Sequence, residues 1–219
     1  MYGSRHALRM QAFEKAGLYL VTSSEHSAGR STETIVQAAL DAGVRLVQLR
    51  EKNMTARESF ECGRRLRKLT SHYDALLIIN DRLDIALAVG ADGVHLGLDD
   101  LPMDAARRLA PDLVLGASSH NIEEALAAQR NGASYVNIGP LFPTGTKAWS
   151  RDFLGLEGLR RIAPKVDLPF TVMGGIKEQH IPDLRAAGAR TIAVVTAVTA
   201  APDPGAAAAK LLNLIRSES

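Results

Sequence analysis

The chain has 219 residues, of which 46% are hydrophobic and 23% charged, and its formal net charge is +2. These values are typical of one globular domain and give no reason to expect a surface for nucleic acid or for a membrane. Met1 to Met10 lack the apolar core of a signal peptide, no apolar run approaches the roughly 18 residues of a membrane helix, and the single cysteine, Cys62, excludes an internal disulfide. We therefore expect a cytoplasmic protein.

Apolar runs alternate with amphipathic segments along the chain. Residues 1–16 are expected to form a short N-terminal helical extension, with its helix at 5–15. Branched apolar residues predict strands at 17–22, 44–49, 75–79, 93–96, 113–117, 135–138, 170–173 and 191–195. Amphipathic patterns and capping residues predict helices at about 32–43, 55–71, 83–89, 103–109, 121–131, 155–163 and 178–187, followed by an alanine-rich helix at the end.

A short repeat supports this alternation. Four segments share the order helix end, glycine, small residue, strand, and their glycines are Gly43, Gly90, Gly132 and Gly188. Glycine suits the left-handed residue that ends a helix. Eight strands alternating with helices predict a parallel α/β fold. We predict a single-domain (β/α)8 TIM barrel over 1–219 rather than an open doubly wound sheet, because polar residues end nearly every strand.

The second predicted strand runs into a polar segment. Alternate residues of a strand face the same side, so Gln48, Arg50 and Lys52 share one face, while Val47 and Leu49 face an apolar layer. Two cations at the carboxyl end of a buried strand indicate an anionic ligand, and we expect a phosphate-binding pocket. The alternative is that Arg50 and Lys52 simply reach solvent where the strand ends.

In a barrel, the carboxyl ends of all strands meet on the face that carries the active site. The other strand ends supply Asn80, Asp81, Asp99, Asp100, Ser118, Thr144, Thr146, Lys147, Gly174, Gly175, Val195 and Thr196. Side chains of both signs, without a cysteine or histidine cluster, indicate phosphate and a hard cation such as Mg²⁺, which takes one or two carboxylates plus phosphate oxygens. Asp81 and Asp100 follow neighbouring strands and are the candidate ligands, although each could instead cap the next helix.

The residues at two further strand ends also indicate phosphate binding. Gly174 and Gly175 allow the backbone to approach a ligand, or else form a tight turn. Val195 and Thr196 could present backbone N–H groups to a phosphate, because the loops after the last two strands are the usual phosphate site of this fold. His95 is expected to be a structural histidine.

Several motifs carry a resemblance to a known family. They are Gln-Leu-Arg-Glu-Lys at 48–52, Asn-Asp at 80–81, Ala-Asp-Gly-Val-His-Leu-Gly at 91–97, Gly-Pro-Leu-Phe-Pro-Thr-Gly-Thr-Lys at 139–147 and Gly-Gly-Ile at 174–176. In order and spacing, the set resembles the thiamine-phosphate synthase (thiamine-phosphate diphosphorylase) family from about residue 17 to the end. The resemblance implies a magnesium-dependent transferase of thiamine biosynthesis. Such an enzyme joins 4-amino-2-methyl-5-hydroxymethylpyrimidine diphosphate to hydroxyethylthiazole phosphate, giving thiamine phosphate and diphosphate.

The resemblance also implies roles for individual residues. The pyrimidine diphosphate would be bound by Gln48, Leu49, Arg50, Glu51, Lys52, Asn80, Ser118 and Lys147. The thiazole phosphate would be bound by Thr144, Gly145, Thr146, Gly175, Val195 and Thr196, and Mg²⁺ by Asp81 and Asp100. Arg50, Lys52 and Lys147 would neutralise the departing diphosphate, with no protein nucleophile. Leu98, Asn137 and Met173 depart from the family pattern, and residues 148–152 are also unusual for it.

Two other functions remain as alternatives. A related barrel such as a thiazole tautomerase has no diphosphate to neutralise, so the presence of Arg50, Lys52, Asp81, Asp100 and Lys147 favours the synthase. A non-catalytic sensor of a phosphate ligand is the alternative from a different class. The partners expected are small-molecule substrates, and the sequence leaves a homodimer open.

Overall fold

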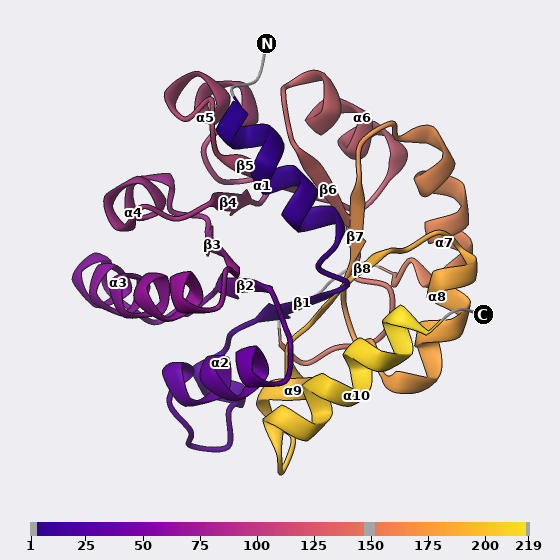
Figure 1. Cartoon of the computed structure of the whole chain (residues 1–219). Coiled ribbons are helices and arrows are strands. Elements are labelled where there is room, and N and C mark those ends of the chain that lie inside the picture. Colours follow the sequence, from indigo (N-terminus) through magenta and orange to yellow (C-terminus); the bar gives the residue numbers. More distant parts are fainter. Residues whose placement is uncertain (1–3, 147–151, 218–219) are drawn as a thin grey trace.

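The computed structural model describes residues 4–146 and 152–217. Eight parallel strands form a closed barrel in chain order, and β8 returns to pair with β1 (Figure 1). The strands are β1 Leu18–Val21, β2 Leu46–Leu49, β3 Leu76–Asn80, β4 Gly93–Leu96, β5 Val114–Ser119, β6 Tyr135–Ile138, β7 Phe170–Val172 and β8 Thr191–Val194. The predicted (β/α)8 barrel is confirmed, and the open doubly wound sheet is wrong.

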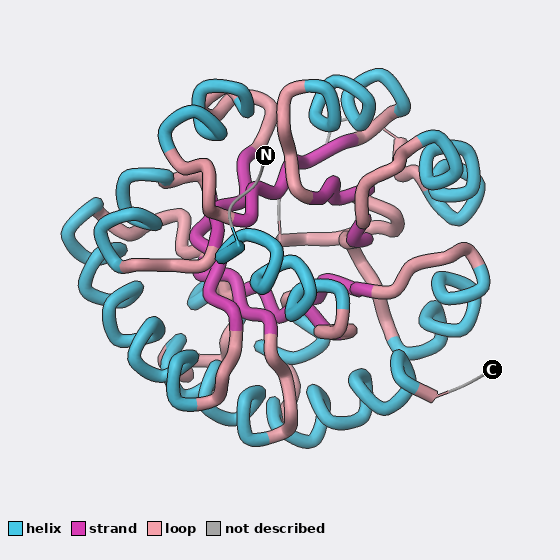
Figure 2. The backbone as a smooth tube through the Cα atoms, turned by 45° about the horizontal axis from the view of Figure 1, so that its top comes forward, coloured by secondary structure: helices cyan, strands magenta, loops and turns pink. Residues whose placement is uncertain are grey.

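Helices surround the strands, all but α1 in an outer ring (Figure 2). They are α1 Ser4–Glu14, α2 Thr32–Asp41, α3 Ala56–His72, α4 Leu83–Val89, α5 Met103–Leu109, α6 Ile122–Arg130, α7 Gly155–Ile162, α8 Ile181–Ala186, α9 Thr196–Thr199 and α10 Pro204–Arg216. Short 3-10 turns lie at Ser24–His26, Ala163–Lys165 and Glu178–His180.

Local signals explain where most helices begin and end. The Ser31 hydroxyl accepts a hydrogen bond from the backbone N–H of Thr34, and Thr55 forms a capping box with Glu58 at the start of α3. The four repeat glycines all adopt positive φ, between 66° and 99°. The helix predicted at 178–187 differs, since Pro182 lies in the first turn of α8 and a 3-10 turn precedes it.

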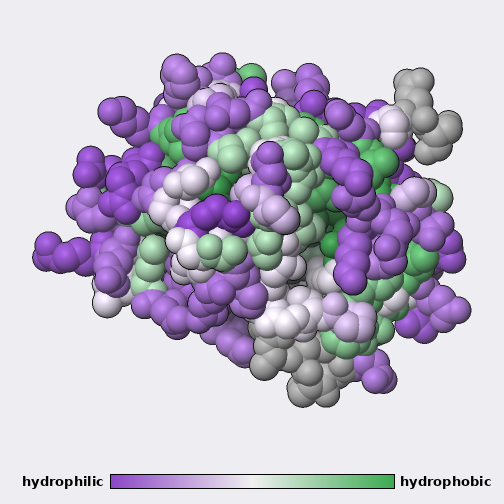
Figure 3. Space-filling model, turned by 90° about the horizontal axis from the view of Figure 1, so that it is seen from below, coloured by the Kyte–Doolittle hydropathy of each residue, from purple (hydrophilic) through white to green (hydrophobic). Residues whose placement is uncertain are grey.

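The two faces of each strand enter different layers. Val47 and Leu49 of β2 are buried in the core between the barrel and the helices, whereas Leu46 faces the barrel interior. The predicted assignment of these faces is therefore confirmed. On the face shown in Figure 3, hydrophilic side chains surround smaller hydrophobic areas. Across the described ranges, no helix combines the length and hydrophobicity that crossing a bilayer requires.

Helix α1 lies across one end of the barrel (Figure 1). The Arg9 guanidinium lies 3.2 Å from the carboxylate of Asp92 and donates to the backbone oxygen of Asp112 at 2.9 Å. The His6 ring is 2.9 Å from the Ser134 hydroxyl. These partners immediately precede β4, β5 and β6. Helix α1 therefore closes the amino-terminal end of the barrel, and in the part of the chain that the structure describes the carboxyl ends of the strands are left for a ligand.

Phe13 completes this closure from inside. Its side chain is 1% exposed and packs against the rings of Tyr19 and Tyr135, whose centroids lie 6.4 and 4.4 Å away. The single phenyl ring thus ties α1 to the interior of the barrel.

Replacing Phe13 tests that role. Phe13→Ala removes a buried ring and leaves a cavity, so we expect the free energy of unfolding to fall by about 3 kcal/mol or more in chemical denaturation. Phe153→Ala is the matched control, because Phe153 is 37% exposed. Equal stability of the two variants would show that α1 does not hold the barrel end.

Candidate active site

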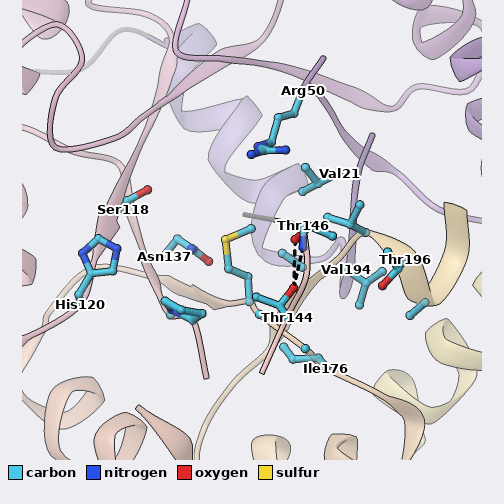
Figure 4. A pocket seen from close by; sticks show the side chains of 18 residues that line it. Val21, Arg50, Ser118, His120, Asn137, Thr144, Thr146, Ile176, Val194 and Thr196 are labelled. Atoms are coloured by element: carbon cyan, nitrogen blue, oxygen red, sulfur yellow. Dashed lines mark hydrogen bonds between the residues drawn. The ribbon is translucent and has the colours of Figure 1, made fainter. Parts of the chain in front are cut away.

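A cavity opens at the carboxyl ends of the strands (Figure 4). The predicted site residues that line it are Arg50, Ser118, Thr144, Thr146, Gly174, Gly175, Val195 and Thr196. They come from five different strand ends, so barrel closure brings together residues that are up to 146 positions apart in the sequence. Figure 4 shows the Arg50 guanidinium turned toward the middle of this group.

Sequence reasoning missed part of the lining. Apolar and polar side chains that it did not assign include Val21, His120, Asn137, Met173 and Ile176. Asn137 was noted only as a departure from the family pattern, as was Met173. The alternation within β6 carries a signal, because Asn137 lies two residues after the inward-facing Tyr135. Leu98, the third departure, is 55% exposed and is not among the residues that line the cavity.

The segment 48–52 divides between two roles. Gln48 is buried in the barrel interior, and its amide donates to the Tyr19 hydroxyl at 2.6 Å. Leu49 is 4% exposed and packs between the barrel and the helices. Glu51 accepts hydrogen bonds from the Ser24 backbone N–H and the Thr32 hydroxyl. The side chains of Leu49 and Glu51 therefore hold the scaffold rather than face the cavity.

Lys52, the other cation of this segment, lies near the carboxylates of Asp81 and Asp100, which follow β3 and β4. The ammonium of Lys52 lies 2.5 Å from a carboxylate oxygen of Asp81, and Asp81 and Asp100 hydrogen-bond to each other. Burial raises the pKa of the Asp81 carboxyl, but hydrogen bonds from Lys52 and Asp100 outweigh it, and the net pKa is lowered. Burial and the neighbouring Asp81 raise the pKa of Asp100. The ionised Asp81 carboxylate thus disfavours ionisation of Asp100, which carries the raised pKa.

The alternative that these aspartates cap helices is wrong. The residue at the start of α4 is Arg82 and that at the start of α5 is Pro102, and neither helix begins with a side-chain cap. Asp81 adopts φ 63°, a left-handed conformation that Asp tolerates better than most residues. Asp100 accepts a hydrogen bond from the backbone N–H of Gly97 at 2.6 Å. The local turns thus hold the two carboxylates against each other.

This donor set fits Mg²⁺. Two carboxylates on neighbouring strand ends match the one or two that a Mg²⁺ ion commonly takes from a protein. Within residues 4–146 and 152–217, no group of three or more His, Cys, Asp or Glu side chains gathers into a metal cluster. A hard cation here would complete its shell with water and with oxygens of a bound substrate. Asn80, the last residue of β3, lies beside this pair and opposite His95 of β4.

The loop after β6 packs onto the end of β7. The backbone N–H groups of Leu141 and Phe142 donate to the carbonyls of Met173 and Gly174, at 2.9 and 3.0 Å. A Cβ on Gly175 would lie 2.3 Å from the carbonyl oxygen of Pro143. The glycine pair therefore permits close approach of this loop, and both glycines also line the cavity.

The threonines of the loop face the cavity together. Their hydroxyls, on Thr144 and Thr146, lie 3.1 Å apart (Figure 4). Gly145 between them is exposed, with no atom within 4 Å of where a Cβ would stand. Val195 and Thr196, at the start of α9, also line the cavity. Lys147, predicted to bind diphosphate, lies outside the described residues.

Comparison with known proteins gives one consistent result. A family model described as thiamine monophosphate synthase matches residues 18–198. The chain is 46% identical to the thiamine-phosphate synthase of Archaeoglobus fulgidus, over 91% of this chain and 93% of the relative. It is 47% identical to that of Chloroflexus aurantiacus, over 90% and 92%. The solved thiamine phosphate pyrophosphorylase of Pyrococcus furiosus superimposes with a TM-score of 0.85 at 39% identity, covering 95% of this chain and 97% of that one.

The carboxylate pair gives a prediction for stability. Because the pKa of Asp100 is raised in the folded state, its ionisation opposes folding: the penalty grows as the pH rises from the unfolded to the folded pKa, is complete above the folded pKa and disappears in acid. Asp100→Asn keeps an oxygen for Gly97 and an N–H for Asp81 but removes the charge. We expect its unfolding midpoint in denaturant, without added metal, to exceed that of the wild type at neutral pH and to converge with it as the pH falls.

The neighbouring Asp99 is the matched control, because it is exposed. Asp99→Asn is expected to leave the midpoint within error of the wild type at every pH. A gain for Asp99→Asn equal to that for Asp100→Asn would trace the effect to net charge and not to the pair.

Proposed function

The chain belongs to the thiamine monophosphate synthase family and is a transferase that forms thiamine phosphate. We propose that its two substrates are 4-amino-2-methyl-5-hydroxymethylpyrimidine diphosphate and hydroxyethylthiazole phosphate. The observation that carries the proposal is the arrangement at one barrel end. Arg50 lines a cavity there, and Lys52, Asp81 and Asp100 lie together at the neighbouring strand ends. This arrangement suits a ligand that combines a ring with a diphosphate.

We assign the diphosphate to the side of the cavity next to β2 and β3. Arg50 and Lys52 would bind its oxygens, and Asn80 and Ser118 would donate hydrogen bonds to the same substrate. Lys52 supports this role even while it contacts Asp81, because an ammonium has three N–H donors. The role expected for Lys147 stays a prediction.

Asp81 and Asp100 would hold Mg²⁺ together with diphosphate oxygens. When bound, the ion would supply positive charge next to the leaving group as negative charge builds there. The chain's own contribution at this point is to fix the two carboxylates through Lys52 and the Gly97 backbone N–H.

The reaction needs only one bond to break and one to form. The carbon–oxygen bond between the pyrimidine methylene and diphosphate breaks, and its electron pair leaves with the diphosphate. The aminopyrimidine delocalises the resulting cation, and the thiazole nitrogen donates its electron pair to the methylene carbon. The cavity walls would hold the two rings in line and keep water from the cation. Val21, Met173 and Ile176 supply apolar walls suited to that task.

No protein nucleophile enters this scheme. Cys62, the only thiol, is 1% exposed, and burial raises its pKa to about 12. It is therefore a packed helix residue and not a reactive thiolate.

The thiazole phosphate would occupy the opposite side of the cavity. The hydroxyls of Thr144 and Thr146 and the backbone around Gly145, Gly175 and Val195–Thr196 are suited to its phosphate oxygens. The cytoplasmic location and the homodimer considered from the sequence stay predictions.

An assay with both substrates tests the function. We expect thiamine phosphate to form in the presence of Mg²⁺, to stop when EDTA is in excess, and to resume when Mg²⁺ is restored. Each substrate alone is the control. Binding of both substrates without any product would instead favour a sensor, and isomerisation of a thiazole without coupling would favour a tautomerase.

Asp81→Asn tests the proposed ion site without disturbing the turn, because Asn tolerates the left-handed conformation at this position. We expect kcat to fall at least about tenfold and the Mg²⁺ concentration for half-maximal rate to rise, while the far-UV circular dichroism stays unchanged. Asp84→Asn is the control, since Asp84 is exposed and pairs with Arg82. Wild-type Mg²⁺ dependence in Asp81→Asn would refute the assignment.

A further inference from the structure

A line of hydrogen bonds crosses the barrel interior and ends at the cavity. The Gln48 amide donates to the Tyr19 hydroxyl at 2.6 Å, and Tyr19 and Tyr135 hydroxyl oxygens lie 3.0 Å apart. The Tyr135 hydroxyl lies 2.9 Å from Nδ1 of His95, and Nε2 of His95 lies 3.1 Å from the Ser118 hydroxyl. The first four residues are buried, whereas Ser118 is half-buried and lines the cavity.

The first donor fixes the direction of every later bond. The Gln48 nitrogen has only hydrogens to offer, so the Tyr19 oxygen accepts and the Tyr19 hydrogen turns to Tyr135. Tyr135 then donates to Nδ1 of His95, which accepts with its lone pair. A neutral His95 therefore carries its hydrogen on Nε2 and donates it to the Ser118 oxygen.

The opposite direction leaves a buried hydrogen unsatisfied. If His95 donated from Nδ1, Tyr135 would have to donate to Tyr19. Tyr19 would then receive hydrogens from both Tyr135 and Gln48, and its own hydrogen would have no acceptor between these two partners. Burial raises the pKa of both tyrosines, so both keep their hydroxyl hydrogens at neutral pH. An unpaired buried hydroxyl is costly, on the order of 1–3 kcal/mol.

A glycine provides the space for this arrangement. A Cβ on Gly116 of β5 would lie 2.2 Å from Cζ of Tyr135, 2.3 Å from its hydroxyl oxygen and 2.5 Å from Nδ1 of His95. The bond between Tyr135 and His95 therefore occupies the position that any larger residue at 116 would need. The close packing of β4, β5 and β6 at Gly116 thus holds the Tyr135 hydroxyl against Nδ1 of His95, in addition to the hydrogen bond between them.

We propose that His95 is a positioning residue, which occupies one lone pair of Ser118 through its Nε2–H and so directs the Ser118 hydroxyl hydrogen to an acceptor atom of the substrate. This assigns His95 a part in substrate recognition beyond the structural role expected from the sequence. The consequence for Ser118 rests on the proposed function, because it requires that Ser118 touches the pyrimidine diphosphate. The tautomer of His95 does not depend on it.

Nitrogen NMR of the ligand-free protein tests the tautomer directly. At about pH 8, where an ordinary histidine is neutral, we expect the His95 ring to be protonated on Nε2. The chain has six histidines, and the signals that are lost in the His95→Gln variant are those of the His95 ring. Tyr135→Phe should mix the two tautomers, because Nδ1 loses its donor. Tyr73→Phe, which removes a hydroxyl bonded to Gln37 and Asp41 on the outer helices, should change nothing. A wild-type ring protonated on Nδ1 would overturn the proposal.

Kinetics test the consequence for the substrate. We expect His95→Leu to lower kcat/KM for the pyrimidine diphosphate about tenfold or more, and His95→Gln, which keeps an N–H donor, to recover most of the loss. The double variant His95→Leu/Ser118→Ala should be no slower than Ser118→Ala alone. Independent, multiplying losses would mean that His95 acts through packing and not through Ser118, which would also overturn the proposal.

The two measurements separate this inference from the proposed function. An Nε2–H tautomer in a protein that makes no thiamine phosphate would refute the proposed function and leave the hydrogen-bond direction standing. Formation of thiamine phosphate by a protein whose His95 carries its hydrogen on Nδ1 would support the proposed function and refute the hydrogen-bond direction.

Discussion

Closure of the parallel sheet is the constraint on which the site depends. Because β1 pairs with both β2 and β8, no strand edge remains in the barrel, and all carboxyl ends point the same way. Helix α1 occupies the opposite end through Arg9 and Phe13. Among the described residues, the end of the barrel that is left for a ligand is therefore the one where Arg50 and the threonine loop line the cavity. An open sheet of the same strands would leave these groups spread along its edge.

The barrel interior changes character from one end to the other. Near α1 it is filled by apolar and aromatic side chains, among them Phe13 and Leu76. Toward the cavity it holds Gln48, His95 and Asn137, all buried. Buried polar groups are tolerated when they are paired, and here the partners come from other strands: Tyr19 for Gln48, Thr171 for Asn137, and Tyr135 and Ser118 for His95. The strand register thus decides which way the polar side chains at the cavity floor can point.

Much of this organisation follows from local rules. Alternation separated the inward face of β2 from its outward face, and glycines at positive φ marked helix ends such as Gly90. Local rules failed where distant backbone decides the outcome. Glu51 accepts hydrogen bonds from Ser24 and Thr32, and the residue pattern within 48–52 does not predict these distant partners. Gly175 is needed against Pro143, a contact made only after the loop folds onto β7.

Asp81 and Asp100 also show that local sequence rules do not predict interactions between residues that are distant in the sequence. Asp is a favoured cap, so propensity alone left the capping role open for Asp81 and Asp100. The structure instead places them against each other, where burial and the repulsion between the carboxylates raise the pKa of Asp100 and the Lys52 ammonium lies beside Asp81. The ion that we propose for this pair requires the ionised form of both carboxyl groups, and a raised pKa disfavours that form for Asp100. The affinity for the proposed ion is therefore expected to fall as the pH falls, because protons and the cation compete for the same oxygens.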